Sequence, residues 1–306
     1  MDNQITVNRL PSKTWNWLKV NQASVPWDQE QTVDLGTEQH SFDTTQPMPV
    51  RIVVETSHPY VKKQIHIEAG AGVSVTVYET FQTAHGLQVQ TNLTVGEGAA
   101  IRLVQVQDTQ PGAVLVSQVN GQCEKGGRIE VYQVLAGRGD VYLGGQVDLN
   151  GDGSSLKSET GYLGRKGQTI DIGLAVNHYG KKTESEMNAS GALKDDARKI
   201  FRGTIDFKKG CADSTGNEKE TVLMLGQDAV NKTVPLILCA EENVVGNHGA
   251  TIGEMDKDTL FYFESRGIDR QSAENMLARA AIERLAHLIG DEETQATILS
   301  QISEEC

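Results

Sequence analysis

Apolar and polar side chains alternate in short runs along the chain from about residue 50 to residue 245. Ile65 and Ile67 show this period of two, and the spacing returns in Val73, Val75 and Val77. Successive side chains of a β-strand point to opposite faces, so strict alternation over short runs predicts half-buried strands. The alternation therefore predicts a body made mainly of β-strands.

Pairs of glycines separate these runs at a regular interval. They recur about every 25 to 30 residues, a period typical of stacked repeats such as the coils of a parallel β-helix. A β-sandwich or a barrel stays open as an alternative, because Asn120-Gly121 and Asn150-Gly151 are signals for tight hairpins. The glycine pairs are Gly70 and Gly72, Gly96 and Gly98, Gly126 and Gly127, and Gly151 and Gly153.

The last part of the chain changes to a helical period. Apolar residues recur three and four positions apart, which predicts helices over 256–265, 270–288 and 292–302, with Gly267 and Gly290 as stops. The chain thus divides into an N-terminal arm (1–50), a β-helix core (51–252) and a C-terminal helical region (253–306). The apolar positions of the second helix are Ala273, Met276, Leu277, Ala280, Ala281, Leu285, Leu288 and Ile289.

The N-terminal arm holds all three tryptophans of the chain, Trp15, Trp17 and Trp27. We expect them to anchor a short helix or an extended segment onto a surface. Either a local apolar cluster of the chain itself or a partner protein would supply that surface.

The charge balance excludes several function classes. Lys and Arg number 28 against 41 Asp and Glu, a net charge of −13, which argues against nucleic acid and against an anionic membrane surface. The N-terminus shows no basic segment followed by an apolar stretch, and no run approaches the roughly 18 apolar residues of a membrane helix. A cytoplasmic protein is the expectation.

Sequence motifs for self-contained chemistry are missing. The cysteines form no C-x-x-C pair, which argues against a zinc or cluster site within the chain and against a disulfide framework. Cys239 follows an apolar run, so we expect a buried packing thiol. No phosphate-binding loop of the form G-x-x-x-x-G-K-[ST] occurs. The four cysteines are Cys123, Cys211, Cys239 and Cys306.

Two of the seven histidines stand out. His178 ends a predicted strand, and His248 is flanked by Gly246 and Gly249. The small neighbours would let a metal or another chain approach the imidazole of His248 closely. An isolated histidine is more often structural, so both interpretations stay open on the pattern alone.

The region around His248 carries a more specific pattern. Residues 247–253 read Asn-His-Gly-Ala-Thr-Ile-Gly, and residues 260–268 read Leu-Phe-Tyr-Phe-Glu-Ser-Arg-Gly-Ile. This resembles the C-terminal signature of the SufB/SufD family of iron–sulfur cluster assembly proteins, in which S-H-G-A-T-x-G precedes L-F-Y-x-x-S-R-G-I and a helix. Segments at 201–205, 222–225 and 235–238 also resemble the family.

The resemblance implies a right-handed parallel β-helix that works as a non-catalytic scaffold. In the family, a SufB–SufD pair docks on two copies of an ABC-type ATPase, SufC, and the nascent iron–sulfur cluster is assembled at the SufB–SufD interface. The C-terminal helices are the part that docks on SufC, so residues 255–288 would bury their apolar face on the ATPase. The implied docking residues are Phe261, Tyr262, Arg266, Gly267 and Ile268.

Two differences point to the SufD branch. SufB-like chains carry a cysteine near the place of Ala229, and they read H-E-A-T where this chain has His248-Gly249. The resemblance makes His248 a candidate iron ligand or proton-transfer group, in a site shared with a thiolate of a SufB-like partner. Gly246 and Leu238 depart from the SufD-like pattern, which often has a cysteine and an acidic residue there. No stably bound cofactor is expected on the chain alone.

Two other functions stay open. A homodimer of this chain could be the scaffold without a separate SufB-like subunit, pairing through edge strands and the strand of His248. Parallel β-helices also host carbohydrate-active enzymes, although no acid–base pair can be singled out here from spacing.

Overall fold

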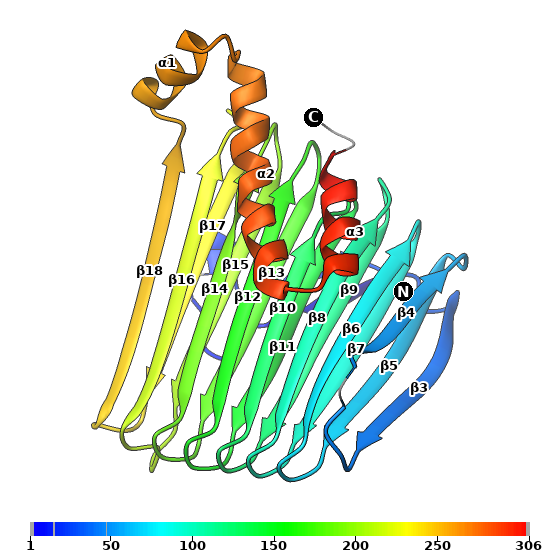
Figure 1. The fold of residues 1–306 in the computed structure, drawn as a ribbon, viewed down its shortest axis with the longest axis vertical. Helices are drawn as coiled ribbons and strands as arrows, with labels where there is room; N and C mark the ends of the chain where they lie inside the picture. The colour runs from blue at the N-terminus through cyan, green and yellow to red at the C-terminus, as the bar shows by residue number, and fades with distance from the viewer. Residues whose placement is uncertain (1–2, 15, 47, 304–306) are drawn as a thin grey trace.

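The computed structural model describes residues 3–14, 16–46 and 48–303. Two sheets of eight strands face each other, and the strand pairs within them are parallel. Consecutive strands alternate between the sheets, so two strands make one coil of a flattened β-helix (Figure 1). The prediction of a parallel β-helix with a C-terminal helical segment is therefore confirmed, and the antiparallel β-sandwich is excluded.

The strands fall into an odd-strand sheet and an even-strand sheet. The odd-strand sheet contains β3 (Thr32–Phe42), β5 (Tyr60–Ala69), β7 (Gly86–Val95), β9 (Val114–Cys123), β11 (Asp140–Leu149), β13 (Thr169–His178), β15 (Arg198–Phe207) and β17 (Val230–Cys239). The even-strand sheet contains β4 (Val50–Thr56), β6 (Ser74–Thr83), β8 (Ala100–Thr109), β10 (Arg128–Leu135), β12 (Ser155–Gly164), β14 (Glu184–Leu193), β16 (Ser214–Met224) and β18 (Val244–Glu254).

The core lies between the two sheets and is built by stacking. Val77 of β6 stands in register with Leu103 of β8, which stands in register with Val131 of β10, and all three are buried. Each coil therefore buries its inner side chains against those of the coils before and after it. The consequence is that the inner side chains of the first and last coils lack one neighbouring layer.

The glycine pairs mark one corner of successive coils. Gly72, Gly98, Gly126 and Gly153 have φ angles of 70°, 63°, 64° and 69°, a left-handed conformation that glycine adopts without steric cost. The amide of Gly72 donates to the carbonyl of Glu97 at 2.9 Å, and the other turns continue this stacking. The turns thus repeat because each coil needs the same backbone reversal at the same place.

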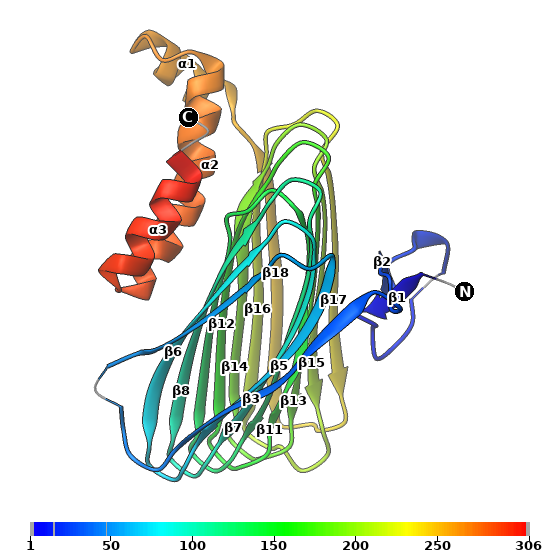
Figure 2. The same cartoon turned by 90° about the vertical axis from the view of Figure 1, so that its right-hand side faces the viewer.

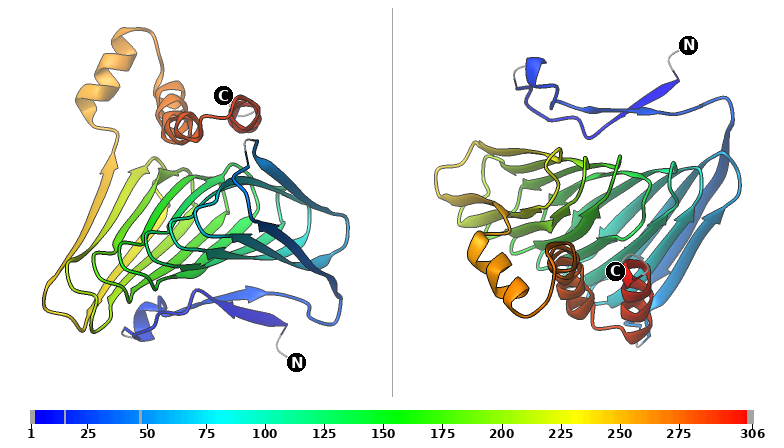
Figure 3. Two further views of the ribbon diagram at one scale, coloured as in Figure 1. Left: turned by 60° about the horizontal axis from the view of Figure 1, so that its bottom comes forward. Right: turned by 90° about the horizontal axis from the view of Figure 1, so that it is seen from above.

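The N-terminal arm folds back along the outer face of the odd-strand sheet (Figures 2 and 3). It consists of β1 (Gln4–Val7), a short 3-10 helix (Asn16–Leu18) and β2 (Ala23–Pro26), and β1 pairs with β2 in antiparallel fashion. Trp27 is buried, with its ring centroid 5.2 Å from that of Tyr60, whereas Trp17 is exposed. The structure thus places Trp27 in a local cluster of the chain itself. Trp15 lies outside the described residues.

The helices are α1 (Lys257–Ser265), α2 (Arg270–Ile289) and α3 (Glu292–Ser303). Helices α2 and α3 lie on the outer face of the even-strand sheet, and α1 stands away from it (Figures 1 and 2). Ile282 and Leu285 of α2 are buried in one cluster with Val104 and Tyr132 of the sheet. The expectation that residues 255–288 bury their apolar face on an ATPase is therefore wrong for α2, because apolar side chains of the chain's own sheet already cover that face.

Within the described part of the chain, none of the helices combines the length and apolar character needed to cross a membrane.

Candidate functional site

The last coil, formed by β17 and β18, leaves the inner side of the β-helix open. The buried side chains of β16 alternate along the strand, and their register partners in β18 point the same way, toward the inside. No further coil follows among the described residues, so these inward positions are half-buried or exposed; Ile252, for example, is 54% exposed. We call this surface the open end; its inward positions are Asn231, Thr233, Pro235, Ile237 and Cys239 of β17 and Val244, Gly246, His248, Ala250 and Ile252 of β18.

His248 lies near the middle of the open end. It is the register partner of Glu218 in β16, and its side chain is exposed. Gly246 occupies an inward position before it, and no atom lies within 4 Å of the place where a side chain of Gly249 would begin. The imidazole is thus accessible to a group arriving from outside the chain.

Cys239 is the second group with metal-binding chemistry at the open end. It is exposed, and its thiol donates to the carbonyl of Glu241 at 3.0 Å. The expectation of a buried packing thiol is therefore wrong. The reason is that Cys239 stands in register with the buried Phe207, one coil further out, where no layer follows to cover it.

The opposite end of the β-helix differs in its chemistry. In β3 of the first coil, Glu38 lies 2.9 Å from His40 and 3.1 Å from Lys63 of β5, whereas β4 of the same coil holds the apolar Ile52 and Val54 at inward positions. None of the inward positions named for the open end is Asp, Glu, Lys or Arg. Fewer charges would therefore lose water if another protein covered the open end.

A group of charged residues lies one layer beneath the open end. Lys199 of β15 and Glu220 of β16 form an ion pair, and each has an exposed side-chain fraction of at most 1%. Glu220 also accepts a hydrogen bond from Thr233 of β17. Burial lowers the pKa of Lys199 to about 7, with the charge of Glu218 opposing the shift. Burial raises the pKa of Glu218 to about 7, with Lys199 opposing it.

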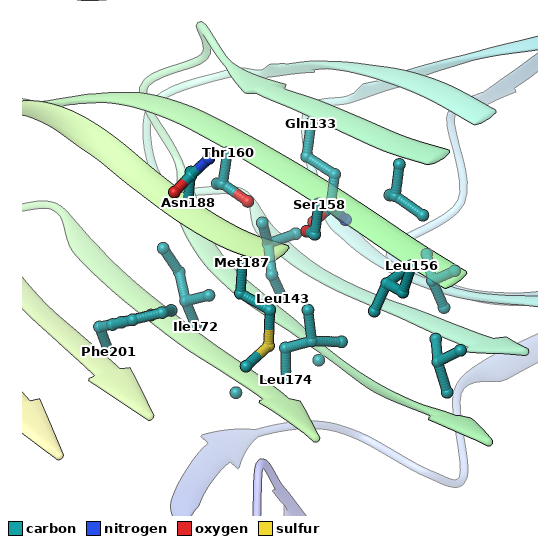
Figure 4. Close-up of a pocket in the computed structure, with 15 residues that line it drawn as sticks. Gln133, Leu143, Leu156, Ser158, Thr160, Ile172, Leu174, Met187, Asn188 and Phe201 are labelled. Atoms are coloured by element: carbon teal, nitrogen blue, oxygen red, sulfur yellow. The ribbon is translucent and has the colours of Figure 1, made fainter. Parts of the chain in front are cut away.

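A small cavity adjoins this group on its inner side. It has a volume of about 20 Å³, enough for a single water molecule. Figure 4 shows Ser158 and Thr160 near it, with Met187 and Phe201 among its apolar lining. Because Met187 is the register partner of Glu218, the cavity borders the charged layer. This cavity therefore has room for water but not for a substrate.

The implied docking residues gather on and after α1. Helix α1 has no buried residue, and Phe261 and Tyr262 are 72% and 55% exposed. The guanidinium of Arg266 lies 5.0 Å from the ring centroid of Tyr262. Gly267 adopts a φ of 77°, which lets the amide of Ile268 reach the carbonyl of Phe263 at 3.1 Å and end the helix. These residues present an aromatic surface that the chain itself does not cover.

The other histidine considered above has a structural place. His178 is fully buried, and its two ring nitrogens lie 2.7 Å from Thr183 and 2.9 Å from Ser185. Burial lowers its pKa to about 4, so the ring stays neutral. In the described residues no three His, Cys, Asp or Glu side chains are placed to hold a metal ion together. A metal at His248 would therefore need ligands from another chain.

Sequence reasoning missed Lys199, Glu218 and Glu220. They are separated by up to 21 residues along the chain (220 − 199) and carry no motif. A signal was nonetheless present in β15, where Lys199 interrupts inward positions that continue with Phe201 and Ile205. Only the packing of the two sheets against each other shows that Lys199 of β15 meets Glu220 of β16.

Comparison with known proteins shows which family this chain resembles. The family model described as "SUF system FeS cluster assembly, SufBD core domain" matches residues 52–281. The iron–sulfur cluster assembly protein SufD of Bacillus subtilis (strain 168) is 28% identical over 183 residues, which cover 60% of this chain and 42% of that protein. SufD of Escherichia coli (strain K12) is 27% identical over 169 residues, covering 53% and 40%.

A plant relative matches over a longer stretch. The chloroplastic SufBD family protein ABCI8 of Arabidopsis thaliana is 26% identical over 249 residues, which cover 76% of this chain and 44% of that protein. The chain thus spans less than half the length of each of these relatives.

The chain folds as a parallel β-helix, and the family model that matches it describes the core domain of Suf-system iron–sulfur cluster assembly proteins. The chain belongs to the SufB/SufD family, and within it the chain is SufD-like.

Proposed function

We propose that the chain is a non-catalytic scaffold subunit of a Suf-type complex that assembles iron–sulfur clusters. In this proposal the open end pairs with a SufB-like subunit, and α1 docks on a SufC-type ABC ATPase, which hydrolyses the ATP. The observation that carries the proposal is the open end itself: an exposed, mostly uncharged inner surface with an accessible histidine at its centre.

Pairing through the open end would complete the stacking that the last coil lacks. β17 and β18 are the outermost strands of their sheets, so one edge of each offers unpaired backbone groups. Half-buried Ile237 and Val244 would lose their remaining contact with water in such an interface. A second β-helix end is the partner whose shape and backbone fit this surface.

His248 would then lie inside the interface. A neutral imidazole is a good ligand for iron, and thiolates of the partner would supply the ligands that this chain lacks. A nascent cluster would thus be held between the two subunits, with the iron and sulfide as cargo rather than as a resident cofactor. Replacing His248 with Ala should leave folding and pairing nearly intact and lower the yield of assembled cluster.

Docking on the ATPase is proposed for the surface of α1. Exposed aromatic side chains are enriched among the residues that dominate protein interfaces, and Phe261 and Tyr262 lie side by side on a helix with no buried residue. Their exposure would be explained by a partner surface.

The second candidate is a homodimer that uses the same open end. A two-fold axis would place two copies of β18 against each other and bring both His248 side chains to one interface. The partner would then be a second copy, and no SufB-like subunit would be needed.

The test is reconstitution with purified subunits. The chain is mixed with a SufB-like subunit and a SufC-type ATPase from the same source, and masses are measured by light scattering after size exclusion. We expect a complex of all three, loss of the ATPase from a Phe261→Ser and Tyr262→Ser double variant, and retention of it by Val53→Ser, a control at the far end of the β-helix that is 63% exposed. A chain that binds neither subunit at micromolar concentration contradicts the proposal, and a stable dimer of the chain alone favours the homodimer.

A further inference from the structure

A second site lies on the other side of the molecule, beneath the N-terminal arm. A cavity of about 240 Å³ separates the arm from the outer face of the odd-strand sheet. Its roof is formed by residues 8–11 of the arm, and its floor by outward-facing residues of β9, β11, β13 and β15. We call this cavity the arm pocket. It is larger than the cavity inside the β-helix and is lined by more polar than apolar side chains.

Small residues on the outer face of the sheet leave space above the backbone at the bottom of the arm pocket. Gly173 and Ala175 are neighbouring outward positions of β13, and Gly145 of β11 adopts a φ of 144° where the pairing with β9 is interrupted. Polar side chains rise on either side, with Gln118 of β9 opposite Arg202 of β15. The result is a trough: the backbone of β11 and β13 lies along its centre, and side chains of β9 and β15 with hydrogen-bonding groups stand along its two sides.

The arm is held over the trough as a defined roof. Asn8 has a φ of 51° and donates from its side-chain amide to the carbonyl of Leu143 at 2.7 Å and to Asp171 Oδ1 at 2.7 Å. Lys232 donates to the carbonyl of Leu18 at 3.3 Å. Because side chains of the sheet bind the arm on both sides of the pocket, the opening is part of the fold and not a gap left by a loose segment.

The arm pocket combines two arginines with amide and hydroxyl side chains that can donate hydrogen bonds. Arg202 is 1% exposed; it pairs with Asp171 and donates from Nε to the carbonyl of Val20, but its Nη2 has no hydrogen-bond partner among the described residues. Arg9 of the roof is exposed and makes no ion pair within the described part of the chain. Asp171 is the one carboxylate engaged here, and Asn8 and Arg202 already occupy it.

The charge balance of the arm pocket follows from these contacts. Arg202 and Asp171 offset each other, and the Arg202 side chain is buried beneath the pocket. Arg9 therefore contributes the positive charge that a ligand in the pocket could reach. Planar or tetrahedral oxyanions match guanidinium donors, often through two parallel hydrogen bonds.

We propose that the arm pocket binds a small molecule bearing a carboxylate or phosphate group, with Arg9 pairing with the oxyanion and Gln118 and Thr204 donating to its remaining oxygen atoms. The site is separate from the open end and from α1, so it does not depend on the scaffold function proposed above.

Calorimetry on the full chain in a buffer without oxyanions tests this site. Inorganic phosphate and citrate are the two probes, which distinguish a phosphate from a carboxylate ligand. We expect at least one of them to bind at a single site and to slow proteolysis of the arm. Arg9→Gln should weaken this binding by at least about tenfold, the effect of one lost charge-assisted hydrogen bond. Ala175→Leu should weaken it as well, by filling the floor without changing charge.

The matched control is Arg128→Gln, which removes an exposed arginine from the outer face of the even-strand sheet. It should leave binding unchanged. The proposal is overturned if neither probe binds at millimolar concentration. It is also overturned if both probes bind the wild type, Arg9→Gln and Ala175→Leu equally, because that result means anion binding elsewhere on the surface.

Discussion

Leu285 of α2 packs directly onto the backbone of Gly161 in β12: a Cβ added at Gly161 would lie 2.8 Å from Cδ2 of Leu285. This contact seats α2 on the even-strand sheet, in a cluster that also contains Ile282 and Ile289. The position of α2 therefore depends on the chain's own sheet. Helix α1 directly precedes α2 in the chain, so the packing of α2 on the sheet also holds the C-terminal end of α1 near a fixed position.

Removing the Leu285 side chain should weaken the packing of α2 on the even-strand sheet. Leu285 is fully buried, so Leu285→Ala should lower the free energy of unfolding by about 2 to 4 kcal/mol, from lost burial and the cavity left behind. Leu288→Ala is the control on the same helix, since Leu288 is 44% exposed and should cost little. Urea unfolding of both variants checks the difference. Equal, small losses would show that α2 is not packed as described.

The buried carboxyl of Glu79 should make stability depend on pH. It accepts hydrogen bonds from Gln105 at 2.7 Å and Thr91 at 3.0 Å inside the β-helix, and burial raises its pKa from 4.5 to about 7. The folded chain therefore binds a proton that the unfolded chain releases above pH 4.5. Stability contributed by this group is present at low pH and is lost as the pH rises toward 7.

Glu79→Gln should remove this part of the pH dependence. At pH 8 the variant should be more stable than the wild type by up to about 3 kcal/mol, because it carries no charge to bury. At pH 5 the two proteins should unfold at nearly the same urea concentration. A stability difference that does not change between pH 5 and pH 8 would show that Glu79 does not titrate in the folded protein. Urea unfolding at the two pH values is the measurement.

The exposed thiol of Cys239 offers a direct probe of the open end. In a Cys306→Ser background, a thiol reagent should modify Cys239 rapidly, while the buried Cys123 and Cys211 should react only on unfolding. Burial raises the pKa of the Cys123 thiol to about 12, which further slows its reaction. If a partner covers the open end, modification of Cys239 should slow at least several-fold. An unchanged rate in a complex of confirmed mass would place the partner elsewhere on the chain.

Gly173 should be required for the close packing of the N-terminal arm on the odd-strand sheet. A Cβ at this position would lie 2.7 Å from Cβ of Asn8, so Gly173→Ala should displace Asn8 and weaken its hydrogen bonds to Leu143 and Asp171. We expect faster proteolysis of the arm and a loss of about 1 to 2 kcal/mol of stability. Gly249→Ala is the control, since no atom lies within 4 Å of its added Cβ. Equal cleavage rates in both variants would contradict the contact.

Much of the fold could be predicted because its signals are local. Alternation along β6 and β8 predicted strands, the left-handed turns fall on one glycine of each predicted pair, and the spacing of Leu285, Leu288 and Ile289 predicted a helix that ends within one residue of the observed α2. A period of two or of 3.6 follows from backbone geometry alone. The resemblance around His248 also held, because a family signature is carried by consecutive residues.

The candidate sites were less accessible to sequence reasoning. Cys239 has the same apolar neighbours as a buried residue would have, and its exposure is decided by the absence of a following coil in this chain. Lys199 and Glu220 meet because the two sheets face each other, and Arg9 lines a pocket with residues of β9 to β15 only because the arm folds back over the odd-strand sheet. No local pattern encodes such meetings.

The sequence by itself thus determined the strands, turns, helices and family of this protein. The tertiary structure alone decided which end of the β-helix is open, which helix is free for a partner, and where charged side chains are buried. The physical reason is that burial depends on which surfaces stack together. Stacking joins residues that are far apart along the chain, whereas periodicity and turn chemistry act between near neighbours.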